Sequence, residues 1–261
     1  MEIKSVKSQF PIFKNKINGK SLIYLDSANS SQKPRSVIDR ITKFYSKEFS
    51  NIGRSVHSLA VTATNRFEET RDLMKKYINA KSREEIIFTK NATEAINLVA
   101  SSYGDKFIKK GDEILITELE HHANYVPWHF LRQKKGAVIK FASCNDRGEV
   151  DIDEIKKLIS DKTKIIAVTH LSNVTGAIMP IKKIVDLASK KKIPVLVDGC
   201  QGAPHLKIDM QELGCDFYAI SCHKMYGPNG LGILYAKKKW VDVLSPYQGG
   251  GGMIEEVKKD N

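Results

Sequence analysis

Several features that mark particular protein classes are missing from the 261-residue sequence. It contains no run of eighteen apolar residues, so no membrane-spanning helix is expected. The first ten residues, MEIKSVKSQF, lack the apolar core of a secretory signal, and the four cysteines form neither a CxxC pair nor a disulfide framework. Both absences predict a cytoplasmic location, where thiols stay reduced. Aromatic residues make up only 8%, but a hydrophobic content of 41% excludes a disordered chain.

Arginine is scarce in a chain whose formal net charge is +12. The 42 basic residues comprise 34 lysines and 8 arginines, and no arginine follows Arg147. Proteins that read nucleic acids favour arginine for its bidentate contacts, whereas the lysines here are spread along the chain in short groups such as 190–192 and 237–239. The composition therefore indicates a lysine-rich solvated surface, and neither a nucleic acid nor a membrane is expected as a partner.

From about residue 85 the hydrophobic pattern alternates between strands and helices. The expected strands are 85–89, 112–117, 137–142, 164–170, 195–198, 215–221 and 232–235, and the expected helices are 91–103, 124–133, 151–159 and 181–191. Strands separated by helices of this length imply βαβ units. We therefore predict a three-layer α/β/α fold with a mostly parallel central sheet. The first eighty residues differ, because only one strand (22–25) and two helices (near 36–49 and 62–78) are expected there.

Polar residues follow five of the expected strands, and this pattern is the strongest sign of a functional site. In open parallel sheets, ligands bind beyond the carboxyl ends of the strands. The residues placed there are Thr93, Glu94, His121, His122, Asn173, Asp198, Ser221, Cys222, His223 and Lys224. Because these strand ends share one edge of the sheet, the side chains are expected to converge on a single site.

Lys224 and Asp198 indicate the chemistry of this site. Lys224 follows an apolar strand, and a partly buried amine is a usable nucleophile toward a carbonyl, although it could also be one of many surface lysines. Asp198 ends a buried strand, where a carboxylate is costly unless it meets a cation. It could be a helix cap or an ion-pair partner, or it could pair with the protonated pyridine nitrogen of pyridoxal phosphate (PLP). Gln201 could then bond the phenolic oxygen of PLP.

The helix start at residues 90–94 suits a phosphate, because it offers free amides and a threonine hydroxyl, although most such starts are plain capping turns. Ser221 and His223 could add donors to the same phosphate, and His121 could stack on a planar ring. His121 and His122 could instead bind a metal ion. No third ligand follows at a zinc-like spacing, so no metal site is expected.

Six segments carry motifs that are specific when taken together: YLDSANSSQKP, EHHANYVPW, THLSNVTG, VLVDGCQ, DFYAISCHKMYGPNGLGILY and GGGGMI. They resemble the class V aminotransferase-type PLP enzymes of fold type I, most closely the Suf-type cysteine desulfurases. The resemblance implies that Lys224 binds PLP covalently and is catalytic together with His121, which stacks on the cofactor ring. It further implies cofactor contacts from Thr93, Glu94, Asp198, Gln201, Ser221 and His223, and substrate contacts from Ala28, Arg54 and Asn173.

The same resemblance implies conversion of L-cysteine to L-alanine in a homodimer, with sulfur passed as a persulfide to an acceptor protein for iron–sulfur cluster assembly. Residues 31–261 would form the PLP-binding large domain, and residues 1–30 would belong to the small domain.

Enzymes of this type are longer, so we expect a chain truncated at its C-terminus that lacks the persulfide-forming cysteine and the arginine that binds the substrate carboxylate. The basic neighbours of Cys222 would favour its thiolate, but it lies too close to the cofactor lysine to replace that cysteine. Two alternatives stay open. One is a related PLP lyase or aminotransferase, for example one like selenocysteine lyase, and the other is a non-catalytic fragment that binds the cofactor.

Overall fold

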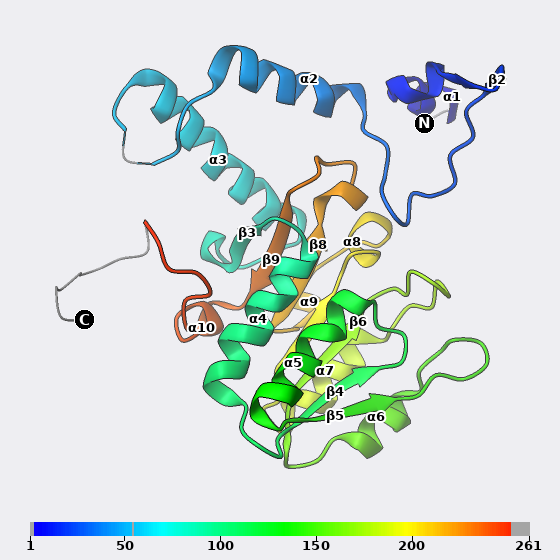
Figure 1. Ribbon diagram of the computed structural model, residues 1–261, viewed down its shortest axis with the longest axis vertical. Coiled ribbons are helices and arrows are strands. Elements are labelled where there is room, and N and C mark those ends of the chain that lie inside the picture. The colour runs from blue at the N-terminus through cyan, green and yellow to red at the C-terminus, as the bar shows by residue number, and fades with distance from the viewer. Residues whose placement is uncertain (1–2, 54, 252–261) are drawn as a thin grey trace.

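The computed structural model describes residues 3–53 and 55–251, and a seven-stranded sheet lies at its centre (Figure 1). The strands are β3 (Ile86–Thr89), β4 (Glu113–Thr117), β5 (Val138–Ala142), β6 (Thr163–Thr169), β7 (Val195–Asp198), β8 (Phe217–Ser221) and β9 (Gly232–Ala236). Their order across the sheet is β3–β9–β8–β7–β6–β4–β5. The five strands from β8 to β5 run parallel, whereas β9 is antiparallel to both of its neighbours. The predicted α/β fold with a mostly parallel sheet is confirmed.

Helices cover both faces of this sheet. The helices on one face are α4 (Ala92–Phe107) and α5 (Val126–Lys135), and those on the other are α6 (Ile152–Leu158), α7 (Ile181–Ser189), α8 (Gly202–His205) and α9 (Met210–Leu213). Successive residues of a strand point to opposite faces, so Phe217 and Ala219 of β8 join one core, and Tyr218 and Ile220 join the other. This two-sided burial explains why the central strands are apolar throughout.

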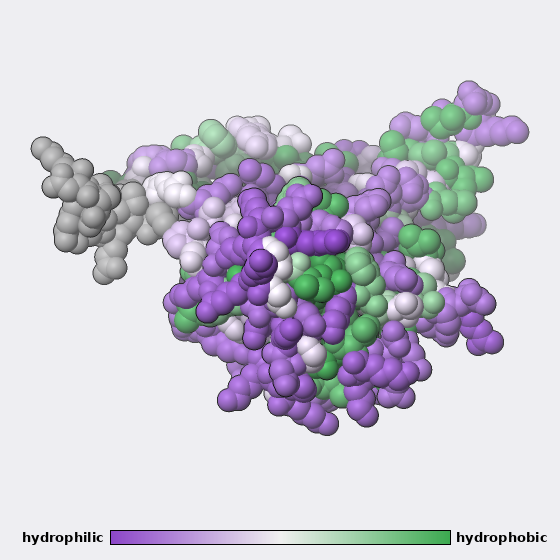
Figure 2. All heavy atoms as spheres, turned by 60° about the horizontal axis from the view of Figure 1, so that its bottom comes forward, coloured by the Kyte–Doolittle hydropathy of each residue, from purple (hydrophilic) through white to green (hydrophobic). Residues whose placement is uncertain are grey.

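The first eighty residues form an arm and a layer of helices beside the sheet (Figure 1). The arm contains α1 (Ile3–Ser8), the turn η1 (Pro11–Lys14) and a ribbon of β1 (Lys16–Ile17) with β2 (Lys20–Ser21). An irregular segment then returns to the sheet, before α2 (Arg35–Lys43), the π-helical turn η2 (Phe44–Glu48) and α3 (Ser58–Tyr77). Two short elements, η3 (Arg83–Glu85) and α10 (Lys238–Val241), flank the sheet. Hydrophobic side chains lie exposed along the arm (Figure 2).

The strand expected at 22–25 is wrong. These residues belong to no strand, and Ile23 and Leu25 are 79% and 92% exposed. A short apolar run becomes a strand only where a partner strand can satisfy its backbone groups, and the ribbon of β1 and β2 ends before it. The helix expected near 62 begins earlier, at Ser58, because the His57 side chain caps it by accepting the Ala60 N–H.

In the ranges that the structure describes, no helix combines the length and the apolar character needed to cross a membrane.

Gly199, which directly follows β7, lies against the ring of Tyr218. A Cβ atom at position 199 would lie 1.8 Å from Tyr218 Cε1, and this ring is fully buried with its hydroxyl oxygen 2.8 Å from His170 Nδ1. We predict that Gly199→Ala lowers the free energy of unfolding by about 3 kcal/mol, because overpacking has no room to relax. Urea unfolding would measure the change. Gly250→Ala, whose added Cβ meets nothing within 4 Å, is the control, and equal midpoints for the two variants would contradict the prediction.

Candidate active site

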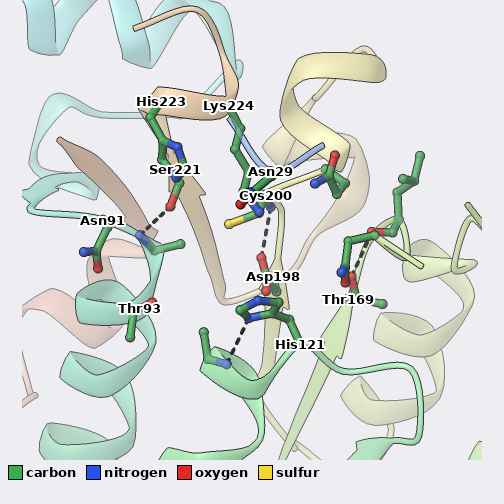
Figure 3. A pocket seen from close by; sticks show the side chains of 15 residues that line it. Asn29, Asn91, Thr93, His121, Thr169, Asp198, Cys200, Ser221, His223 and Lys224 are labelled. Atoms are coloured by element: carbon green, nitrogen blue, oxygen red, sulfur yellow. Dashed lines mark hydrogen bonds between the residues drawn. The ribbon is translucent and has the colours of Figure 1, made fainter. Parts of the chain in front are cut away.

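A cavity of about 210 Å³ opens at the carboxyl ends of the parallel strands (Figure 3). Its walls come from the ends of β6, β7 and β8, the turn after β4, the start of α4 and the segment before α2. The lining residues are Asn29, Asn91, Ala92, Thr93, His121, Ala123, Thr169, Leu171, Asn173, Asp198, Cys200, Gln201, Ser221, His223 and Lys224. Residues that follow five different strands therefore meet at one place.

Most residues predicted for the site line this cavity, namely Thr93, His121, Asn173, Asp198, Gln201, Ser221, His223 and Lys224. Glu94 does not line it, because its carboxylate accepts the Lys90 backbone N–H at 2.6 Å and stays at the start of α4. Its predicted cofactor contact stays a prediction. Ala28 lies beside the lining, where its carbonyl oxygen accepts a hydrogen bond from Gln201 Nε2 at 2.6 Å. Arg54 lies outside the described residues.

Asp198 places a buried negative charge at the end of β7. The residue is 4% exposed, and its Oδ1 accepts the Cys200 backbone N–H at 3.0 Å. No basic side chain in the described part of the chain lies within ion-pair distance, 4.0 Å, of its carboxylate. A buried carboxylate without a cation is costly. The cavity therefore fits a ligand that carries its own cation, and the protonated nitrogen of a pyridine ring is such a group.

His121 faces the same space from the turn after β4 (Figure 3). Its Nδ1 accepts the Ala123 backbone N–H at 3.1 Å, which caps the short helix η4 (His122–Asn124) and leaves the ring proton on Nε2. Burial is the main cause that lowers the pKa of His121; Asp198 opposes this effect, and Lys224 adds to it. A neutral imidazole in this position offers a flat face to a planar ligand.

Glu120 holds the His121 turn in place, and the sequence reading did not identify it. Its Oε1 accepts hydrogen bonds from the Thr117 hydroxyl at 2.6 Å and the Thr169 backbone N–H at 2.9 Å, and its Oε2 accepts one from Asn124 Nδ2 at 2.6 Å. Burial raises the pKa of Glu120 to about 8, against the effect of these three donors. The side chain thus ties together the ends of two strands and η4. Its position directly before the two histidines of EHHAN was the available signal.

The start of α4 forms the polar end of the cavity. Asn91 caps this helix through its Oδ1, which accepts the Glu94 N–H at 2.8 Å. The Ala92 N–H donates to the Ser221 hydroxyl at 2.9 Å and so joins the end of β8 to the helix. Thr93 lies on the same side of the cavity as Asn91 and Ser221 (Figure 3). Hydroxyl groups beside the positive end of a sixteen-residue helix suit a phosphate group.

Lys224 enters the cavity from the turn that follows β8. It is the last residue of the short helix η5 (Cys222–Lys224), and its side chain points toward Asp198 and Cys200 (Figure 3). The amine and the buried carboxylate therefore face the same space. A lysine and a buried carboxylate that face one cavity without forming an ion pair are the defining feature of the site.

Two cysteines lie close to this lysine, and burial raises the pKa of both thiols. Cys200 lines the cavity, which the sequence reading missed although the residue follows Asp198 by two positions. Burial raises the pKa of the Cys200 thiol well above its usual value. Cys222 does not line the cavity, and burial raises the pKa of its thiol to about 11. The expectation that basic neighbours favour a thiolate at Cys222 is therefore wrong, because desolvation outweighs them.

The fold and the cavity define an α/β protein with a lysine–carboxylate site at one edge of its sheet, and comparisons with known proteins agree. The Aminotransferase class-V family model matches residues 23–261. A cysteine desulfurase of Wigglesworthia glossinidia brevipalpis is 48% identical over 256 residues, which cover 98% of this chain and 62% of that protein.

Two solved structures are also similar. The crystal structure of the cysteine desulfurase CsdA (S-sulfonic acid) from Escherichia coli has a TM-score of 0.90 at 37% identity, with 100% of this chain and 64% of that chain covered. The structure of SspA in complex with cysteine has a TM-score of 0.83 at 27% identity, with coverages of 89% and 66%.

The chain belongs to the aminotransferase class-V family. It spans 37–63% of the length of the curated relatives that it matches.

The raised pKa of Glu120 predicts how the stability of this chain depends on pH. Between the ordinary glutamate pKa and about 8, the folded chain keeps a proton that the unfolded chain has lost, so stability falls as pH rises through this window. One pKa unit corresponds to about 1.4 kcal/mol. We therefore expect a loss of at least about 1 kcal/mol between pH 5 and 8, which Glu120→Gln should remove.

Urea unfolding at several pH values would measure this effect, with Glu212→Gln, at an exposed helix position, as the control. An unchanged pH slope in Glu120→Gln would contradict the prediction.

Proposed function

We propose that this chain is the PLP-binding part of a Suf-type cysteine desulfurase, which converts L-cysteine to L-alanine and passes the sulfur on as a persulfide. The observation that carries the proposal is the cavity in which Lys224, Asp198 and His121 face one another beside a phosphate-suited helix start. Relatives named as cysteine desulfurases support the reaction, and SspA, which was solved in complex with cysteine, supports the substrate.

The residues of the cavity fit PLP group by group. Asp198 would hold the proton on the pyridine nitrogen, since its carboxylate lacks a cation within the described chain. The His121 imidazole would cover one face of the ring, and the start of α4 with Ser221 and Thr93 would bind the phosphate. Gln201, whose amide group bonds to Ala28, lies nearby on the cavity wall.

PLP, once bound, supplies an electron sink for the bond that breaks at the substrate α-carbon. Lys224 Nζ is the group positioned to hold the cofactor and then to remove the α-proton of the substrate. Asp198 holds the positive charge that the electron sink needs. Asn29 and Asn173 line the open side of the cavity, and we assign the substrate carboxylate to Asn173.

Sulfur transfer needs a thiolate, and the cysteines beside Lys224 do not provide one. Burial raises the pKa of both Cys200 and Cys222. We therefore place the persulfide-forming cysteine outside this cavity and the final sulfur acceptor on another protein. This division suits a chain that spans 62% of the Wigglesworthia relative. The reaction is assigned to the cytoplasm, where thiols stay reduced.

A homodimer is part of this proposal. Helix α2 has no buried residue, and its apolar side chains form a stripe with Tyr45 of η2 and with Phe49, which directly follows η2. The stripe consists of Ile38, Ile41, Tyr45 and Phe49, which are 37%, 38%, 69% and 61% exposed. An apolar stripe of this kind marks a contact surface. Residues 31–261 are assigned to the PLP-binding domain and residues 1–30, which form most of the arm, to a second domain.

The first prediction tests the cofactor. The chain mixed with PLP should turn yellow, and borohydride reduction should leave the cofactor on the peptide that contains Lys224, as mass spectrometry would show. Lys224→Ala should abolish this attachment, because the variant lacks the amine that faces Asp198. Lys182→Ala, at a 55% exposed side chain of α7 outside the cavity lining, is the control. Covalent attachment of PLP that persists in Lys224→Ala would contradict the proposal.

The second prediction tests the reaction. In D2O, the PLP-loaded chain should exchange the α-hydrogen of L-cysteine through Lys224, while alanine should form only when the remaining part of a cysteine desulfurase is supplied in trans. Nuclear magnetic resonance would follow both products. Alanine from the chain alone would show that one of its own four cysteines accepts the sulfur as a persulfide. A keto acid would favour an aminotransferase, and binding without exchange would favour a non-catalytic fragment.

A further inference from the structure

The loop before α2 is hydrogen-bonded to the turn that carries Lys224, although about 190 residues separate them in the chain. The Ser31 backbone N–H and hydroxyl donate to the His223 carbonyl oxygen at 3.0 and 2.9 Å. Lys33 Nζ donates to the same oxygen at 2.8 Å. The Ser30 hydroxyl oxygen lies 3.2 Å from His223 Nδ1, and the Tyr226 N–H donates to the Ser31 hydroxyl at 2.7 Å. Three donors thus converge on one carbonyl oxygen.

This carbonyl belongs to the peptide unit that leads into Lys224. The carbonyl of Cys222 is satisfied inside the turn, because it accepts the N–H groups of Met225 and Gly227, each at 2.9 Å. The hydrogen bonds of the His223 carbonyl instead come from Ser31 and Lys33. Fixing this oxygen fixes the peptide plane, and the plane sets the direction in which the Lys224 side chain leaves the backbone.

The turn also contains a strained residue that the same loop holds. Tyr226 has a φ of +65°, which is unfavourable for a bulky side chain. The Ser31 hydroxyl accepts its N–H, and the ring of Phe10 lies 5.9 Å from its ring. Without these contacts the turn would relax toward a more favourable φ. The arm therefore stabilises a backbone that the turn alone does not.

Lys33 is half-buried, and both of its hydrogen bonds go to backbone carbonyls, those of Ser31 at 2.6 Å and His223 at 2.8 Å. Burial lowers the pKa of Lys33, and its charge is one of the causes that lower the pKa of His223, after burial and Lys224. Partial desolvation of an ammonium group costs free energy, and the hydrogen bonds to the two carbonyl oxygens offset this cost.

We propose that Lys33 is a positioning residue, which orients the Lys224 side chain by holding the carbonyl oxygen of His223. The inference rests on the proposed function, because the amine that it orients is the one that captures PLP. Lys33 acts through the backbone and does not line the cavity itself.

The test is the rate at which the chain captures PLP. Lys33→Met keeps most of the apolar stem and removes the ammonium donors. We expect this variant to capture PLP about tenfold more slowly, because small errors of placement slow a bond-forming step. The growth of yellow colour and borohydride trapping at Lys224 would measure the rate. The unfolding midpoint of the cofactor-free chain should stay unchanged. Lys20→Met, at an exposed residue of the same arm, should capture at the original rate.

Two further variants separate positioning from folding. Lys33→Arg keeps a cationic donor and should recover part of the rate. Ser31→Ala removes the hydroxyl that contacts His223 and Tyr226 and should slow capture in the same way, even if Lys33→Met proves unstable. Capture at the original rate in Lys33→Met or Ser31→Ala would overturn this inference but not the proposed function. The same holds if the rate of capture falls only in proportion to the fraction of unfolded chain. A parent chain that never attaches PLP at Lys224 would overturn both this inference and the proposed function.

Discussion

The active-site edge of this protein depends on one buried negative charge, the carboxylate of Asp198. It ends a strand that lies between two parallel neighbours, so the backbone around it is already paired. The described chain supplies a backbone N–H to this carboxylate but no cation. Burial of the charge favours a ligand that carries a cation. This preference follows from the position of Asp198 at the end of a central strand of the sheet.

Hydrogen bonds hold the other chain segments of the site in place around Asp198. Glu120 ties the ends of β4 and β6 to η4 and so holds the imidazole of His121. Ser221 ties the end of β8 to the start of α4, where a phosphate would bind. Each tie is a hydrogen bond between groups that are buried or partly buried, where water competes weakly. The cavity thus has a preformed shape, although its residues come from five strand ends.

Lys224 is positioned by a different kind of contact. Its turn carries a strained tyrosine, and its hydrogen bonds come from a loop near the other end of the chain. The arm behind this loop exposes apolar residues, and Ile23 and Leu25 are the clearest examples. A segment that contributes little to the central core thus bonds directly to the turn that carries Lys224.

Much of the fold could be predicted from the sequence, because the strands of the central sheet are apolar runs buried on both faces and the helices between them show a regular apolar periodicity. The apolar runs located every strand of the central sheet, and the polar residues directly after them located Asp198, His121 and Lys224. That rule works because parallel strands bring their carboxyl ends to one edge. Glu94 does not line the cavity, since a residue in the first turn of a helix can bond back to the helix start.

Only the tertiary structure decided the features that depend on distant partners. The strand expected at 22–25 is absent because no partner strand lies beside it. The sequence also did not reveal the hydrogen bonds of Glu120 or the burial that raises the pKa of the Cys200 and Cys222 thiols, because desolvation is a property of packing. The bonds from Ser31 and Lys33 to the His223 carbonyl belong to the same group. The positions of the cavity residues along the chain were thus predicted from the local pattern, whereas the orientation and burial of their side chains depend on contacts between segments that are distant in the sequence.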